Sequence, residues 1–235
     1  MERKIVITAD GSTTIHLPEW NEHYHSKHGA IQEAYHVFIK NGLSYFCHPE
    51  LLPADRQGVS GSHSKTNILE VGFGTGLNTF ITLLEAEKNN MDIDYTGVEA
   101  YPVSIEEIEQ LNYPSQLNEE EKTALFNKLH NLSWEEKHVV TAHFHLTKQK
   151  RFFSEIADQN KYDIIYFDAF GARVQPELWT EDIFEKMHQA LKINGILVTY
   201  AAKGSVRRAM LSVGFKVEKL PGPPGKREML RATRL

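Results

Sequence analysis

The chain has 235 residues, of which 41% are hydrophobic and 24% charged, and its formal net charge is −5. This composition is typical of a soluble globular protein and argues against indiscriminate nucleic-acid binding. No apolar run approaches the roughly 20 residues that span a bilayer, and the first residues lack the apolar core of a signal peptide. The single cysteine, Cys47, excludes an internal disulfide and favours a reducing compartment. We therefore expect a cytoplasmic protein without membrane association.

Residues 1–60 differ in pattern from the rest and are predicted to form an N-terminal β/α extension. Residues 4–16 alternate around an Asp-Gly pair, which is typical of a β-hairpin. Residues 25–38 are compatible with a helix, and another strand or loop is expected near residues 43–46.

Residues 61–235 are predicted to form one Rossmann-like domain, a mostly parallel doubly wound sheet with helices on both faces. The pattern predicts strands at 66–72, 93–99, 138–145, 162–168 and 195–201, and helices at 76–89, 102–110, 150–158, 180–193 and 204–213. The polar stretch at about 111–137 is too long for a simple loop and predicts a small helical insertion. Two last runs, 215–220 and 228–235, flank a Pro-Gly-rich turn and predict an antiparallel hairpin at one sheet edge.

Three glycines, Gly72, Gly74 and Gly76, lie between an apolar strand and a helix. Glycine permits positive φ and lets a ligand lie against bare backbone, and the first N–H groups of the helix carry partial positive charge. The spacing differs from the G-x-G-x-x-G dinucleotide fingerprint, and Glu70 would repel a pyrophosphate. A turn without a ligand is the alternative interpretation.

Glu99 ends the second predicted strand of the domain, where an acidic residue commonly accepts hydrogen bonds from ribose hydroxyls. Together with Glu70 it favours a nucleoside that carries a cationic group and no phosphate. S-adenosyl-L-methionine has these properties, and it is the cofactor that the sequence predicts.

Asp168 ends the apolar run that begins at Tyr162. Ligands of doubly wound folds bind beyond the carboxyl ends of the strands, where the strand order reverses. Asp168 is therefore expected beside the glycine turn, where it could orient a substrate amine and accept its proton. An aspartate that merely caps a turn is the alternative. The predicted cofactor contacts are Glu70, Gly72, Phe73, Gly74, Thr75, Gly76, Leu77, Asn78, Glu99, Ala100 and Asp168.

The C-terminal part of the chain is basic, with nine Lys and Arg residues and two Glu residues from Ala201 to Leu235. Such a face could contact phosphates at chosen points, and a solvated surface with scattered counter-ions is the alternative. The histidines His23, His25 and His28 lack partners at metal-ligand spacing, so no metal is predicted.

Four separated blocks resemble, in order, the methyltransferase domain of the MnmC family: Glu70–Asn78, Asp168–Trp179, Thr199–Arg208 and Lys226–Met229. Enzymes of that family complete the 5-methylaminomethyl-2-thiouridine of the tRNA wobble position. The block Tyr24–Ala30 is similar to standalone members, which lack the FAD-dependent oxidase domain of the larger form.

The resemblance implies an S-adenosyl-L-methionine-dependent N-methyltransferase that acts on the 5-aminomethyl group of the wobble (2-thio)uridine, with Asp168 as the catalytic residue. It leaves open which precursor is used and whether a separate oxidase partner supplies it. Aminopropyl transfer, or methylation of another small amine, is the alternative. The candidate contacts with substrate or with the anticodon region of tRNA are Tyr24, Phe170, Arg207, Arg208, Lys226 and Arg227.

One departure concerns the adenine of the cofactor. Methyltransferases of this fold often carry an aspartate after the third strand, whereas residues 145–148 hold no carboxylate. The backbone or Thr147 could make the contact instead.

Overall fold

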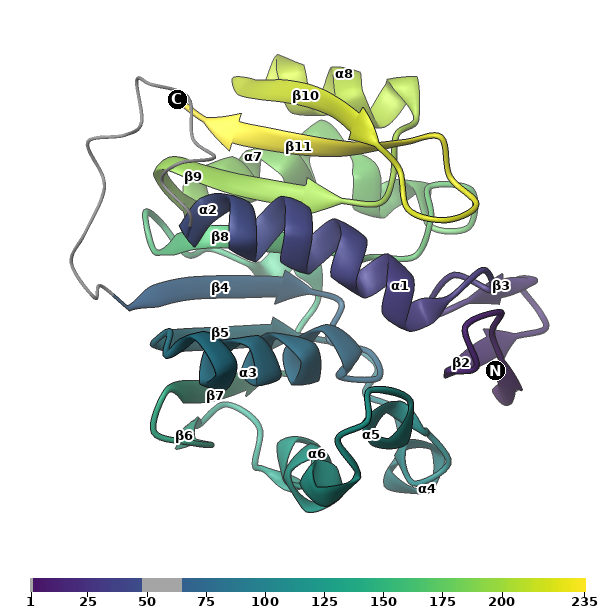
Figure 1. The fold of residues 1–235 in the computed structure, drawn as a ribbon. Coiled ribbons are helices and arrows are strands. Elements are labelled where there is room, and N and C mark those ends of the chain that lie inside the picture. The colour runs from purple at the N-terminus through teal and green to yellow at the C-terminus, as the bar shows by residue number, and fades with distance from the viewer. Residues whose placement is uncertain (1, 48–64) are drawn as a thin grey trace.

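The computed structural model describes residues 2–47 and 65–235, which form a small sheet and a large sheet (Figure 1). The small sheet has the order β1-β2-β3. Residues 2–47 contain the three strands of this sheet and the helices that follow them: β1 (Lys4–Ile7), β2 (Thr13–Leu17), β3 (Glu22–His23), α1 (Ala30–Ala34), the π-helix η1 (Tyr35–Ser44) and α2 (Tyr45–Cys47). The predicted boundary between residues 60 and 61 lies outside the described residues.

The predicted N-terminal hairpin is confirmed, because β1 and β2 pair antiparallel from Lys4 with His16 to Ile7 with Thr13. The predicted helix at 25–38 is displaced. The helical run begins at Ala30 and continues to Cys47, so residues 43–46 are helical rather than strand or loop. The reason is tertiary, since Phe38 and Leu43 of this run are buried in the core between the run and the large sheet.

The large sheet has the order β10-β11-β9-β8-β4-β5-β7-β6. The elements from residue 66 onward are β4 (Thr66–Val71), α3 (Leu77–Asn89), β5 (Ile93–Val98), α4 (Ile105–Ile108), α5 (Tyr113–Gln116), η4 (Glu120–Lys122), α6 (Thr123–Asn131), β6 (Lys137–Val139), β7 (Phe144–Gln149), η5 (Phe153–Glu155), β8 (Tyr162–Phe167), η6 (Pro176–Trp179), α7 (Glu181–Ala190), β9 (Leu191–Thr199), α8 (Gly204–Ser212), β10 (Phe215–Pro221) and β11 (Glu228–Arg234).

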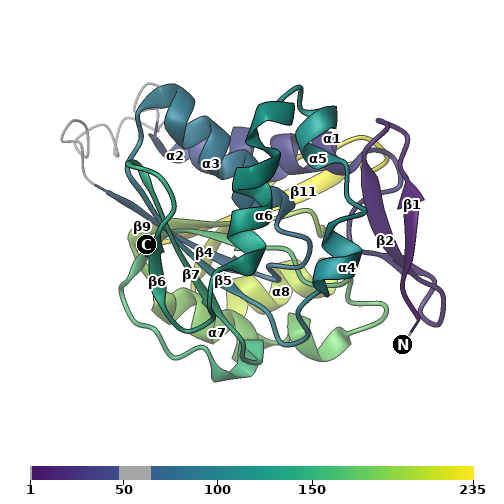
Figure 2. The ribbon, with the colours of Figure 1, turned by 90° about the horizontal axis from the view of Figure 1, so that it is seen from below.

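The five strands β9, β8, β4, β5 and β7 are parallel, and antiparallel strands lie at both edges. Helices cover both faces of the sheet, with α1, α3 and α6 on one face and α7 and α8 on the other (Figure 2). The predicted Rossmann-like fold is confirmed, as is the C-terminal hairpin of β10 and β11. The stretch at about 111–137, where a helical insertion is expected, contains α5, η4 and α6.

Two predicted elements are wrong. The strand expected at 138–145 is split into β6 and β7, because the chain turns between Val139 and Phe144 and the alternation of buried residues continues to Gln149. The helix expected at 150–158 is only the short 3₁₀ turn η5. The helix expected at 102–110 is reduced to α4, and that expected at 180–193 ends at Ala190, where β9 begins at once.

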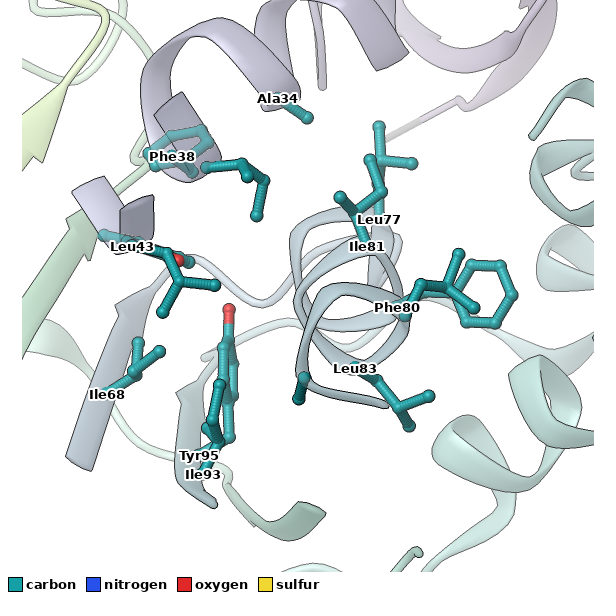
Figure 3. Close-up of a cluster of buried hydrophobic side chains, with 14 of the residues drawn as sticks. Ala34, Phe38, Leu43, Ile68, Leu77, Phe80, Ile81, Leu83, Ile93 and Tyr95 are labelled. Carbon is teal, nitrogen blue, oxygen red and sulfur yellow. The ribbon is translucent and has the colours of Figure 1, made fainter. Parts of the chain in front are cut away.

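Apolar side chains fill both spaces between the sheet and the helices. Figure 3 shows part of the first cluster, in which α3 contributes Leu77, Phe80, Ile81 and Leu83 and the sheet contributes Ile68. Full burial of each large apolar side chain stabilises the fold by roughly 1.5–3 kcal/mol. No helix among the described residues is long and apolar enough to cross a membrane.

The register of the strands aligns the carboxyl ends of β4, β5 and β8. Val71, the last residue of β4, pairs with Val98 of β5 on one side and with Phe167 of β8 on the other. Glu99 and Asp168, which come directly after Val98 and Phe167, therefore lie at the same edge of the sheet as the residue after Val71. Since the chain passes from β4 to β5 on one side and reaches β8 on the other, the strand order reverses here, which is where this class of fold binds ligands.

Candidate active site

The glycine turn brings the end of β4 against the end of β8. Gly72, Gly74 and Gly76 have φ angles of +96°, +48° and +71°, which residues with a Cβ rarely adopt. A Cβ at Gly72 would lie 2.6 Å from the backbone oxygen of Asp168. Glycine is therefore required for the two strand ends to meet.

Two apolar residues of the predicted cofactor set, Phe73 and Leu77, have side chains in the hydrophobic core. The Phe73 ring is buried beside Gly97, where a Cβ would lie 2.5 Å from the ring. Leu77 is buried at the first position of α3. These side chains support the turn from behind, so the backbone is the part of each residue that faces the ligand side.

Thr75 links the turn to two distant segments. Its buried hydroxyl oxygen accepts a hydrogen bond from the Tyr113 hydroxyl at 3.0 Å and lies 2.7 Å from Nε2 of His25. Burial lowers the pKa of His25 to about 4, so the imidazole is neutral and can accept the Thr75 proton. The N-terminal extension and the helical insertion thus hold the turn through one side chain.

Asn78 bridges two of the three predicted carboxylates. Its amide Nδ2 donates to Oε1 of Glu70 and to Oδ2 of Asp168, each at 2.9 Å. Glu70 is fully buried, and its other oxygen accepts from the Thr79 hydroxyl. Asp168 is only partly buried. Glu70 therefore acts beneath the turn through Asn78, while Asp168 faces the ligand side.

The two carboxyl groups have raised pKa values. Burial raises the pKa of Glu70 to about 8, with a further contribution from the Asp168 charge, against the hydrogen bonds of Asn78 and Thr79. Burial and the charge of Glu33 raise the pKa of Asp168 to about 7. At neutral pH Glu70 is mainly protonated, whereas Asp168 is close to its midpoint and can gain or lose a proton.

Glu70→Gln is expected to remove a pH dependence of stability. A carboxyl group that titrates near 4.5 when unfolded and near 8 when folded binds more protons in the folded state between these values, so the folded state loses stability as pH rises from 4.5 to 8. The variant should melt at a higher temperature than the unmodified chain at pH 8.5 and at a similar temperature at pH 5. Thermal unfolding at both pH values measures this, and an equal difference in Tm at both would contradict it.

Glu99 lies directly against the turn. Its Oε2 accepts the Gly74 amide at 3.0 Å, and its Oε1 accepts the Tyr101 amide at 3.0 Å. Each carboxylate oxygen keeps a further lone pair. Glu99 and the adjacent Ala100 are both partly exposed, so this strand end can accept hydrogen bonds from a ligand.

Aromatic rings stand over the same end of the sheet. The Tyr24 and Phe170 rings meet edge to face at 5.0 Å, and Trp20 packs on Phe170 at 5.7 Å. Tyr24 also covers the turn, since a Cβ at Gly74 would lie 3.2 Å from its ring. Trp179 is buried and donates its indole N–H to the Phe170 carbonyl, a core role that fixes this segment.

Glu33 is a site residue that sequence reasoning missed. It is buried in α1, where its Oε1 accepts the Ser26 amide at 3.0 Å, and its Oε2 pairs with Nζ of Lys226. The ammonium of Lys226 also lies 3.7 Å from the centroid of the Tyr200 ring. Lys226, expected to contact tRNA, is thus compensated by a carboxylate of its own chain.

The other predicted tRNA contacts lie at the carboxyl end of the sheet. Arg207 and Arg208 are in α8, which follows the end of β9. Arg227 lies in the β10–β11 loop, which is at the same end because Glu228 begins the strand that pairs antiparallel with β9. Arg208 and Arg227 are exposed, and Arg207 is partly buried.

A second residue that the sequence did not single out is Lys148 of β7. It is buried, donates to the His130 carbonyl at 2.6 Å and stands over the Trp134 ring at 4.9 Å. Burial lowers its pKa to about 8. With Phe73 and Gly74 of the turn, and with residues 102–105 after the end of β5, these residues line a pocket of about 360 Å³.

The fold and the site together define a nucleoside-binding α/β enzyme, with a glycine turn after one central parallel strand and carboxylates at the ends of its two neighbours. Residues 107–235 match the model of a family described as S-adenosyl-L-methionine-dependent methyltransferase. The chain belongs to this family of S-adenosyl-L-methionine-dependent methyltransferases, and S-adenosyl-L-methionine is its cofactor, as the sequence predicted.

Similarity to individual proteins extends over nearly the whole chain. The chain is 29% identical to the tRNA 5-methylaminomethyl-2-thiouridine biosynthesis bifunctional protein MnmC of Cupriavidus metallidurans, over 95% of this chain and 33% of that protein. It is 31% identical to the protein of the same name from Leptospira borgpetersenii, over 88% of this chain and 31% of that protein. The chain spans about one third of the length of these relatives.

Among solved structures, MnmC2 from Aquifex aeolicus superposes with a TM-score of 0.74 at 25% identity, over 98% of this chain and 70% of that chain. The resemblance to the MnmC methyltransferase domain is confirmed. A spermidine synthase from Thermotoga maritima, 12% identical with a TM-score of 0.52 over 100% of this chain and 72% of that one, shares the fold alone.

Proposed function

We propose that the chain methylates the 5-aminomethyl group of the wobble (2-thio)uridine of tRNA, the final step in forming 5-methylaminomethyl-2-thiouridine. The names of the relatives, which refer to the biosynthesis of 5-methylaminomethyl-2-thiouridine in tRNA, support this choice of substrate. The observation that carries the proposal is Asp168, a carboxylate that is hydrogen-bonded to Asn78 beside the glycine turn and lies two residues before Phe170, whose ring packs on Tyr24. A cytoplasmic location and a separate oxidase partner that supplies the aminomethyl precursor complete the proposal.

The residues at the strand ends fit the cofactor. S-adenosyl-L-methionine supplies a methyl group that its sulfonium already activates. The backbone of the turn from Gly72 to Gly76 would lie against it, beside the Tyr24 ring that packs on Gly74, and Glu99 would accept from its ribose hydroxyls. This assignment uses the backbone of Phe73, Thr75 and Leu77 and leaves Glu70 and Asn78 as supports.

We assign the adenine to an exposed aromatic pair. Thr147 lies inside β7, opposite Thr96 and two residues before the strand end, so it cannot take the place of the missing carboxylate at the strand end. Tyr101 and Phe152 follow the ends of β5 and β7, their ring centroids are 6.0 Å apart, and their exposed fractions are 64% and 53%. Exposed rings of this size beside Glu99 offer stacking to a planar base.

The chain's own residues would prepare the amine. An aminomethyl group is largely protonated at neutral pH and has no lone pair until it loses a proton. Asp168, with a pKa near 7, can bind the ammonium and accept that proton. The neutral nitrogen could then accept the methyl group that the cofactor supplies, and S-adenosyl-L-homocysteine would leave. Phe170 and Tyr24 would hold the uracil ring.

Methylation in vitro tests this function. The purified chain, S-adenosyl-L-methionine with a labelled methyl group, and tRNA that carries 5-aminomethyl-2-thiouridine should give labelled 5-methylaminomethyl-2-thiouridine in nucleoside mass spectrometry. Label transferred only to free small amines would reject tRNA as the substrate. Calorimetric binding of decarboxylated S-adenosylmethionine in preference to the cofactor would favour aminopropyl transfer.

Arg208→Glu combined with Arg227→Glu is expected to weaken tRNA binding by about tenfold or more and to reduce the dependence of log K on log salt by about two units, because each cation would otherwise release about one counter-ion. Cofactor affinity should not change. Fluorescence titration of tRNA at several salt concentrations measures both quantities.

A matched control reverses two charges at the opposite end of the sheet. Lys88 lies in the last turn of α3 and Lys216 is the second residue of β10, and both are exposed. Lys88→Glu with Lys216→Glu makes the same change in net charge. If both double variants weaken tRNA binding equally, the position of the basic face does not matter and the assignment fails.

A further inference from the structure

Asp168 has a charged neighbourhood that comes from both ends of the described chain. Glu33 belongs to α1 of the N-terminal extension, and Lys226 belongs to the loop of the C-terminal hairpin. They form an ion pair, and the side chain of Glu33 is only 6% exposed. A buried carboxylate of this kind requires a partner, because removal of one member of such a pair leaves an uncompensated charge.

Tyr200 links the ion pair of Glu33 and Lys226 to the residues that follow β8. The Lys226 ammonium lies 3.7 Å from the Tyr200 ring centroid, within the range of a cation–π contact. The Tyr200 hydroxyl donates to the carbonyl of Ala169 at 2.8 Å, the residue after Asp168. The ring therefore holds the ammonium beside the segment that carries Asp168.

The charges of the pair act on Asp168. After burial, the negative charge of Glu33 is the largest influence that raises the pKa of Asp168, and Lys226 lowers it. The other titratable groups near Asp168 are Glu70, which is mainly protonated at neutral pH, and the neutral hydroxyls of Tyr113 and Tyr200. With Asp168 ionised, two carboxylates and one ammonium give the site a net charge of −1.

We propose that Lys226 is a specificity-determining residue, whose ammonium fills the carboxylate-and-aromatic position formed by Glu33 and Tyr200, so that the site accepts a substrate with one ammonium group and rejects a diamine. This rests on the proposed function, in which Asp168 binds the substrate amine. The single ammonium of such a substrate would neutralise the net charge of −1 that Asp168, Glu33 and Lys226 leave together. A second would face Lys226 and be repelled.

The proposal predicts a gain of binding. Lys226→Met would leave two carboxylates and a Tyr ring without an internal cation, which suits a dication. 1,4-Diaminobutane, with S-adenosyl-L-homocysteine present, should bind this variant about tenfold or more tightly than it binds the unmodified chain, a difference of about 1.4 kcal/mol. Calorimetry measures the affinity without tRNA or methyl transfer.

A double variant separates charge from structure. Glu33→Gln with Lys226→Met removes both charges and returns the site to −1, so the gain in diamine affinity should disappear. This variant also leaves no unpaired buried carboxylate, and it remains informative if Lys226→Met alone folds poorly. Lys219→Met, which breaks the exposed pair of Lys219 with Glu228 in the same hairpin, should bind diamine no better than the unmodified chain.

Two results would overturn the proposal. One is a folded Lys226→Met variant that binds 1,4-diaminobutane no more tightly than the unmodified chain. The other is a double variant that binds it as tightly as the single one. Failure of the unmodified chain to methylate tRNA would instead reject the proposed function. The diamine titrations would in that case still report how Lys226 affects the binding of amines at this site.

Discussion

Asp168→Asn is expected to reduce methyl transfer on the order of 10²–10⁴-fold, the usual contribution of a positioned proton acceptor, while cofactor affinity stays nearly unchanged. The amide keeps an oxygen that can accept from Asn78, as Oδ2 of Asp168 does at 2.9 Å. It cannot carry negative charge or take a proton. The substrate ammonium would lose its counter-ion and its route to the reactive neutral form.

Single-turnover methylation of tRNA as a function of pH, with calorimetry of cofactor binding, tests this expectation. In the unmodified chain the rate should rise with pH through about 7, because the pKa of Asp168 is about 7 and the ionised form accepts the proton. The residual rate of the variant should lack that rise. A variant that retains the pH profile and most of the rate would assign the proton transfer elsewhere.

Gly72→Ala is expected to destabilise the fold by about 2–4 kcal/mol, or roughly 4–16 °C in Tm for a chain of this size, and to abolish cofactor binding. A methyl group at φ +96° is strained in any surroundings. Here it would also lie 2.6 Å from the backbone oxygen of Asp168. Because that atom is backbone, relief requires the ends of β4 and β8 to separate.

Gly171→Ala is the matched control. It lies three residues after Asp168, and its added Cβ would meet only the Tyr200 hydroxyl, at an ordinary contact distance of 3.7 Å. Its Tm should stay within about 2 °C of the unmodified chain. Equal losses of stability in both variants would show that any added methyl near the site disturbs the fold and would remove the special role of the turn.

The central fold could be predicted from the sequence because its signals are local. Each central strand is an apolar run, and three closely spaced glycines between a strand and a helix indicate a tight turn. The prediction failed where tertiary packing decides the boundary. At residues 138–149 one continuous alternation contains an edge strand, a turn and an interior strand, and no local residue marks the division.

The candidate site was predictable only in part, for a similar reason. Glu70, Glu99 and Asp168 could be found because they end apolar strands or lie beside the turn. Nothing local marks Glu33, which is one acid in an amphipathic helix, and its partner Lys226 lies 193 positions away. The hydrogen bond of His25 with Thr75 spans 50 positions. Contacts over such separations come from the packing of whole elements.

The ion pair of Glu33 with Lys226 also bears on the order in which the enzyme is made. Translation delivers the acid early and the base 193 positions later, so a nascent chain that already contains the glycine turn has not yet acquired the cation that pairs with Glu33. On the proposed function, the charges around Asp168 are complete only once the C-terminal hairpin has been synthesised.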